Sequence, residues 1–131
     1  MSKLIGLDLS NLDLSGRNFS DENLFGANLS GANLKNADLS RANLKGANLS
    51  EAEIAGANLK NADLTEANLY DADFSEADLE DANLQGAMIE WTLLSNANLS
   101  GANLEDAKYN SGTIWPEGFN PKEHGAILIE D

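Results

Sequence analysis

Residues 27–46 read ANLSGANLKNADLSRANLKG, which is four units of five residues, each beginning with Ala, then Asn or Asp, then Leu. The same period extends along most of the chain. Every fifth residue from Leu9 to Tyr109 is apolar, and the residue two places earlier is Ala from Ala27 to Ala107, except at Thr92. A fixed period over such a length indicates a repeat architecture, which outranks local propensity.

Neither a helix nor a straight strand satisfies a period of five. Five residues rotate an α-helix by roughly 500°, so the Leu side chains would spread around all its sides. A strand alternates every two residues, so successive Leu residues would lie on opposite faces. The remaining structure is a chain that turns a corner once per unit. Its Ala and Leu side chains point inward, Asn or Asp points outward, and the last two residues of the unit form the turn. Such a chain coils into a solenoid whose backbone pairs with coils about 4.8 Å above and below.

The units at residues 27–31 (ANLSG) and 62–66 (ADLTE) resemble the pentapeptide repeat family, whose unit is A(D/N)LXX. The resemblance covers about residues 7–109. It implies an all-β fold, a right-handed quadrilateral β-helix with four units per coil, hence about five coils here. The tail at residues 115–121, WPEGFNP, is similar to that of small cyanobacterial members.

The two ends of the chain depart from the repeat. We expect residues 1–109 to form the β-helix, with an atypical first coil in which Leu7 and Leu12 replace the inward Ala and close the end. Residues 110–131 are expected to cap the other end, with a possible short helix between Asn120 and Gly125. The alternative for that apolar end is self-association, giving a homodimer rather than a monomer. At the first coil we also expect Arg17 and Glu22 to form or approach an ion pair.

Composition excludes several functions. Acids outnumber bases by 22 to 8 and the formal charge is −14, which disfavours direct binding to nucleic-acid phosphates. There is no cysteine and one histidine, His124, so we expect no catalytic, cofactor or metal site. No apolar run reaches the roughly 18 residues of a membrane helix, and the amino terminus lacks a secretory signal. We therefore expect a cytoplasmic, non-enzymatic protein that does not bind membranes.

The first candidate partner-binding feature is a concentration of acids. Residues 61–107 contain no Lys or Arg, and six acids fall at outward positions within eleven residues. We call these the acidic cluster: Asp71, Asp73, Glu76, Asp78, Glu80 and Asp81. The cluster either keeps the solenoid soluble or engages a basic surface of a partner.

The second candidate feature is apolar. Met88, Trp91 and Leu93 stand at positions that are polar and outward in other units, and we call them the apolar corner. We expect the terminal segment to fold back over this corner; the alternative is a partner-binding patch. Tyr70 and Phe25 are interpreted as isolated outward aromatics.

The function favoured by these observations is an acidic protein-interaction scaffold, with another protein as partner. The family resemblance also implies an alternative, a DNA-mimicking modulator of DNA gyrase, although about five coils make a rod of only ~25 Å. The least favoured hypothesis is a cation-binding or enzymatic role of the acidic columns.

Overall fold

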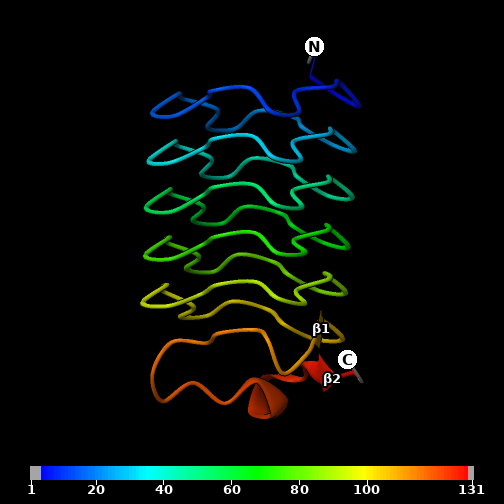
Figure 1. Cartoon of the computed structure of the whole chain (residues 1–131), viewed down its shortest axis with the longest axis vertical. Helices are drawn as coiled ribbons and strands as arrows, with labels where there is room; N and C mark the ends of the chain where they lie inside the picture. Colours follow the sequence, from blue (N-terminus) through cyan, green and yellow to red (C-terminus); the bar gives the residue numbers. More distant parts are fainter. Residues whose placement is uncertain (1–3, 130–131) are drawn as a thin grey trace.

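The structure is a computed structural model that describes residues 4–129, and these residues form a stack of coils along the long axis of the molecule (Figure 1). Parallel bridges join the central residue of each unit to the residue twenty places further on, from Asp8–Asn28 to Met88–Lys108. Four units therefore complete one coil. Identical positions in successive coils lie directly above one another.

One unit, residues 27–31, shows how the coils are joined. Asn28 donates its N–H to the carbonyl of Leu7 in the coil before (2.9 Å), whereas Leu29 and Gly31 donate to the coil after (2.7 and 2.9 Å). The turn is closed by the N–H of Ala32, which donates to the Leu29 carbonyl. The fifth residue of every unit from Gly6 to Asp106 has a positive φ, as a type II turn requires.

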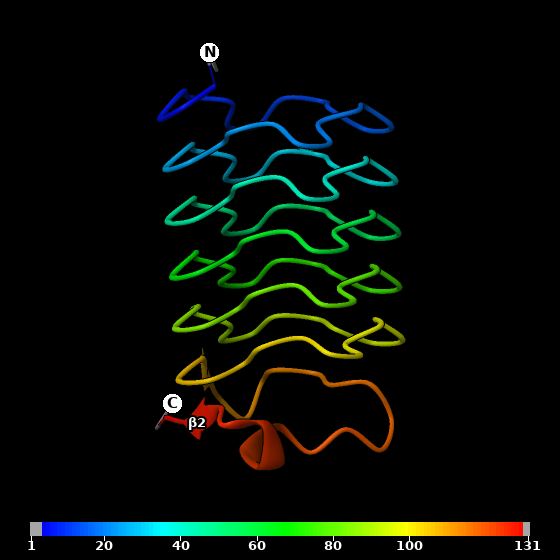
Figure 2. The same cartoon turned by 180° about the vertical axis from the view of Figure 1, so that it is seen from behind.

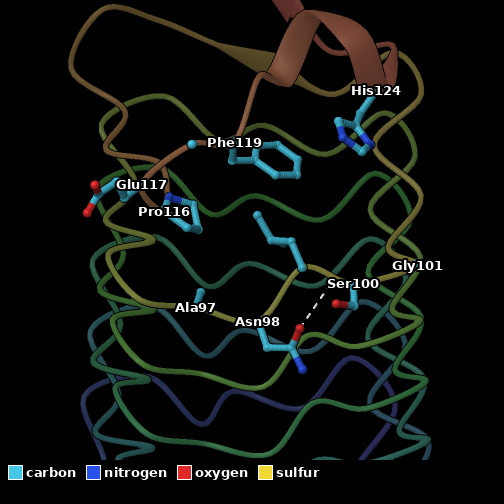
Figure 3. A pocket seen from close by; sticks show the side chains of 10 residues that line it. Ala97, Asn98, Ser100, Gly101, Pro116, Glu117, Phe119 and His124 are labelled. Atoms are coloured by element: carbon cyan, nitrogen blue, oxygen red, sulfur yellow. Dashed lines mark hydrogen bonds between the residues drawn. The ribbon is translucent and has the colours of Figure 1, made fainter.

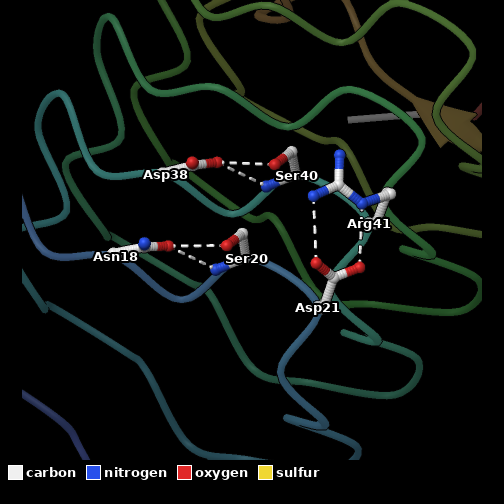
Figure 4. Close-up of polar contacts among 6 residues, drawn as sticks. All are labelled: Asn18, Ser20, Asp21, Asp38, Ser40 and Arg41. Atoms are coloured by element: carbon white, nitrogen blue, oxygen red, sulfur yellow. Dashed lines mark hydrogen bonds and ion pairs between the residues drawn. The ribbon is translucent and has the colours of Figure 1, made fainter.

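The central Asn or Asp of a unit also accepts hydrogen bonds from the turn that follows it, which its outward position alone does not reveal. The Asp38 carboxylate accepts the backbone N–H of Ser40 (3.0 Å) and its hydroxyl (2.7 Å), and Asn18 and Ser20 repeat this arrangement (Figure 4). The Ser40 hydroxyl, followed by its N–H, lowers the pKa of Asp38. The Asn/Asp preference therefore reflects side chains that cap the turn that follows them.

The inward Ala and Leu columns make one continuous core. Phe74 is fully buried in the column that also holds Leu34 and Ile54. Thr92, the exception in the Ala column, is fully buried as well, and its hydroxyl donates to the Leu69 carbonyl at 2.7 Å. A polar residue is tolerated here because its hydrogen bond is satisfied.

The first coil corrects two expectations. Leu7 and Leu12 do not close the end, because their side chains are 42% and 46% exposed. Half-buried Leu9 and Phe19 pack against the core instead. The predicted ion pair is also wrong: within residues 4–129, no contact of 4.0 Å or less joins a charged group of Arg17 to one of Glu22.

The last coil loses the regular spacing. Leu93 pairs with Ile114, twenty-one places on, whereas β1 (Lys108–Tyr109) pairs in parallel with β2 (Ile127–Leu128), nineteen places on. Between β1 and β2 in the chain lies a four-residue 3-10 helix, η1 (Pro121–His124), flanked by Asn120 and Gly125. Figure 2 shows this segment as a wide loop that hangs away from the coil before it.

Aromatic rings line the inner side of this terminal loop. Trp115 packs edge-on against Tyr109 (5.4 Å between centroids) and stacks on Phe119 (5.3 Å), which stacks on His124 (4.4 Å). The exact boundary between solenoid and cap stays a prediction. In the described part of the chain, the helical residues are those of η1, and no helix is long or apolar enough to cross a bilayer.

Candidate interaction surfaces

The coil register divides the acidic cluster between two neighbouring faces. Asp73 bridges to Leu93, and the N–H of Asp71 donates to the Glu90 carbonyl at 3.0 Å, so both acids lie directly above the apolar corner. Asp78 bridges to Asn98 on the next face. The same part of the sequence, residues 76–81, also contains Glu76, Glu80 and Asp81. All six side chains are exposed or half-buried.

One base partly neutralises the cluster. The Lys60 ammonium lies 3.6 Å from a carboxylate oxygen of Asp78 and 3.8 Å from one of Glu80. The sequence analysis missed this pairing because Lys60 stands just outside the base-free stretch, although twenty residues added to 60 give 80. These pairs are about half exposed, so each contributes at most about 1 kcal/mol. The other four acids have no ion pair within 4.0 Å among residues 4–129.

The outward columns mostly avoid stacking acid on acid. In one column, Asp38, Asn58, Asp78 and Asn98 alternate, and the Asn98 amide donates to Asp78 at 3.2 Å. Among the bridged pairs of the described residues, Glu53 and Asp73 are the two acids that meet, and Lys35 lies 3.2 Å from Glu53. Like charges at directly opposite positions of neighbouring strands are destabilising. The alternation of Asp and Asn therefore allows the coils of an acidic chain to stack with less repulsion.

The apolar corner is only partly covered by the terminal segment, which corrects the expected fold-back. Gly112 packs against the Trp91 ring so closely that a Cβ at that position would collide with it. The side-chain carbonyl of Asn110 accepts the backbone N–H of Trp91 at 3.0 Å. Met88, Trp91 and Leu93 nevertheless remain 39%, 44% and 39% exposed. The segment therefore supports the corner from below and leaves its outer surface open.

The structure adds residues to this corner. Ile114, which is exposed, pairs with Leu93 through the shifted register, so it extends the apolar surface into the last coil. Tyr70 is exposed one coil above Glu90, beside Asp71. The period could have placed Tyr70, but it could not place Ile114, because one extra residue enters the chain after Tyr109.

Together these residues make a surface with an apolar centre and an acidic border. Protein–protein interfaces commonly combine a buried aromatic anchor with a polar rim. The Trp91 ring packs against Gly112, which limits the side-chain entropy lost on binding. The arrangement can bind a partner that offers an apolar pocket flanked by Lys or Arg.

Metal binding and catalysis have less support in the structure than binding of a partner. Within residues 4–129, no group of three or more His, Cys, Asp or Glu side chains is arranged to hold a metal ion. His124 is exposed and stacks on Phe119, at the rim of the terminal loop. The acids are spread along ladders, where hydrogen bonds to the following turn occupy several of them.

Comparison with known proteins agrees with this architecture. Rfr23, a pentapeptide repeat protein from the cyanobacterium Cyanothece 51142, is 30% identical with a TM-score of 0.83, over 85% of this chain and 89% of that one. A pentapeptide repeat protein of the Arabidopsis thaliana thylakoid lumen is also 30% identical, with a TM-score of 0.62, over 82% of this chain and 68% of that one.

A more distant likeness concerns the fold alone. QnrB1, a plasmid-mediated fluoroquinolone resistance protein, has a TM-score of 0.65 at 17% identity, over 98% of this chain and 85% of that one. No curated protein sequence matches this chain.

The family model described as pentapeptide repeats matches residues 23–61, 47–86, 57–96 and 72–108, with eight copies. These overlapping matches span more than half of the chain. The fold is thus the all-β, right-handed quadrilateral β-helix that the family resemblance implied, and the chain belongs to the pentapeptide repeat family.

Proposed function

We propose that this protein is a non-enzymatic, acidic interaction scaffold that binds another protein through the apolar corner and the acids above it. The observation that carries the proposal is the exposed Trp91 ring, held from below by Gly112 and bordered by Asp71 and Asp73. A solenoid core explains buried apolar residues but not an apolar group exposed at an outward position.

Charge and shape would act at different stages of binding. Acids without a basic partner attract a basic surface over roughly a Debye length, about 8 Å at physiological salt, and this raises the association rate. Burial of the apolar corner would then slow dissociation, because aromatic anchors usually carry most of the binding energy. The coil ladder keeps both groups in place without an ordering step.

Capture from an extract of the native host, followed by kinetics with the captured protein, tests this proposal. The bait carrying Asp71→Asn, Asp73→Asn, Glu76→Gln and Asp78→Asn removes four charges, and Asn retains the carbonyl oxygen that caps the turn. We expect slower association and a weaker salt dependence with this bait. Trp91→Ala should instead raise the dissociation rate.

A matched control removes four charges elsewhere. Asp8→Asn, Asp13→Asn, Asp21→Asn and Glu22→Gln reduce the net negative charge equally, but at the first coil, and should leave association nearly unchanged. Equal slowing by both charge variants would show a non-specific effect of net charge. A dissociation rate unaffected by Trp91→Ala would remove the apolar corner from the interface.

The second candidate function is modulation of DNA gyrase by mimicry of DNA. The uncompensated acidic charge on a narrow, regular rod supports it, and the likeness to QnrB1 concerns the fold alone. About five coils correspond to ~25 Å, or ~7 base pairs. A supercoiling assay with purified gyrase decides: unchanged supercoiling at a large excess of this protein rejects it.

Three further points remain proposals. A cation-binding role of the acidic columns is the least favoured, and calorimetric titration with calcium and magnesium tests it. A homodimer through the carboxyl-terminal end is the alternative to a monomer. The cytoplasmic location stays a prediction, and one of the relatives above is described from the thylakoid lumen.

A further inference from the structure

The lower edge of one face of the solenoid is left without a strand. In the coil above, Leu79 and Asp81 donate their N–H groups to the carbonyls of Asn98 and Ser100, both at 2.8 Å. The corresponding N–H groups of Leu99 and Gly101 have no acceptor among residues 4–129. A regular next coil would have supplied those acceptors, so two ladder donors lie open at this edge.

The terminal loop leaves this edge open because it takes another path. Asn98 and Asn103, on two successive faces, have no bridge to the following segment in the described chain, whereas Leu93 before them and Lys108 after them do. Pro116, which has no N–H to donate, starts the detour toward η1. Within this detour, Trp115 and Phe119 stack on each other and pack against the core.

A cavity of about 380 Å³ lies between the edge and the loop. Ser100 and Gly101 lie on one side and Phe119 and His124 on the other (Figure 3), and Leu99 and Glu117 also line the cavity. The volume falls within the range of ligand-binding pockets. It joins open backbone donors, an aromatic wall and a carboxylate in one place.

We propose that this cavity binds a short extended segment of a partner protein, which pairs in parallel with residues 97–101 and completes the missing strand. The coils above define the pairing. A carbonyl of the segment would accept from Leu99, the carbonyl two residues later would accept from Gly101, and an N–H would donate to the carbonyl of Ala97, as Asn98 donates to Ala77 at 2.9 Å. This is recognition by strand addition.

The lining also indicates the side chains of the segment. An inward residue would lie beneath Leu99 and against Phe119, which suits an aliphatic side chain. An outward residue would face Glu117 at the cavity and the acidic cluster one coil higher, which favours Lys or Arg. Lys60 above Glu80 already shows such a pairing along a ladder, at 3.8 Å.

The inference is independent of the apolar corner, so either can fail alone. Its test uses the full-length, 15N-labelled protein and a synthetic peptide with the sequence of residues 37–46, ADLSRANLKG, blocked at both ends. This probe has the repeat pattern and a net charge of +1. We expect saturating peptide to slow amide exchange at Leu99 and Gly101 by about tenfold or more, while the already paired Leu79 and Asp81 stay unchanged.

Two matched controls isolate backbone pairing and charge. A peptide N-methylated at its Asp and Asn residues cannot donate to Ala97 and should bind at least about tenfold more weakly. Glu117→Gln should weaken binding of the unmodified peptide a few-fold at low salt, and Glu51→Gln, which lies on a distant corner, should not.

Several results would overturn the proposal. One is unchanged exchange at Leu99 and Gly101 with about 1 mM peptide. Another is equal binding of the N-methylated peptide. Protection of these amides that rises with protein concentration alone would identify a second copy of the chain as the occupant. None of these results depends on Trp91, so the proposed function is tested separately.

Discussion

Removal of the Phe74 ring gives the most direct test of the core. Phe74 is fully buried, with coils above and below it. Ladder bonds of 2.7 Å, from Phe74 to Leu93 and from Ile54 to Asp73, hold the spacing of those coils. The surroundings can therefore collapse little into a cavity. Phe→Ala substitutions in cores cost about 3–5 kcal/mol, and we expect Phe74→Ala to fall in the upper half of that range.

Two further variants make the measurement quantitative. Phe74→Leu restores the residue type found elsewhere in the column and should cost no more than about 1.5 kcal/mol. Ser75→Ala removes a half-buried hydroxyl contact with Asp73 at an outward position and should stay within about 0.5 kcal/mol. Guanidinium unfolding followed by circular dichroism gives the free energies, provided the slope with denaturant is unchanged. A Phe74→Ala cost below about 1 kcal/mol, or one equal to that of Ser75→Ala, would refute the inward and outward assignment.

Three other variants test local contacts. Ser40→Ala should raise the pKa of Asp38 toward 3.8, as measured by NMR titration. The lowered pKa stabilises the folded protein at pH values above the pKa of Asp38 in the unfolded chain, and this stabilisation is lost as the pH falls through the pKa of the folded state. The free energies of unfolding of the two proteins should therefore become equal in strong acid. Gly112→Ala should push the Trp91 ring outward, which acrylamide quenching would detect, and destabilise by about 1–3 kcal/mol; unchanged quenching would contradict the packing. Thr92→Val should cost about 1 kcal/mol in thermal or chemical unfolding, and a stabilised protein would contradict the role of the buried hydroxyl bond.

The period of five was sufficient to predict the solenoid, because a repeated inward Leu and a repeated turn leave few other structures. It also identified the outward positions of the acidic cluster. The twenty-residue coil could also have placed Lys60 above Glu80, but that contact was missed because Lys60 stands just outside the stretch that contains no base. The sequence could not place Ile114, because the register there depends on one extra residue and on how aromatic rings pack.

The ends were predicted least well. An atypical first coil was expected from Leu7 and Leu12, but the exposure of these side chains depends on having a neighbouring coil on one side only. At the other end, composition indicated an apolar cap without revealing the open donors at Leu99 and Gly101. Repetition specifies contacts between like units, whereas the ends are determined by contacts that occur once.

The exact coil of twenty residues has a consequence for how such a chain can change length over evolution. Duplication or loss of a whole coil keeps every column in line, so the rod can lengthen or shorten while its faces keep their identity. A change of any other size rotates all later residues onto different faces. The single extra residue before Ile114 is accommodated because few coils follow it. The same insertion near Leu84, between the acidic cluster and the apolar corner, would move the corner out from under the acids above it, so gene variants of this protein should differ in steps of twenty.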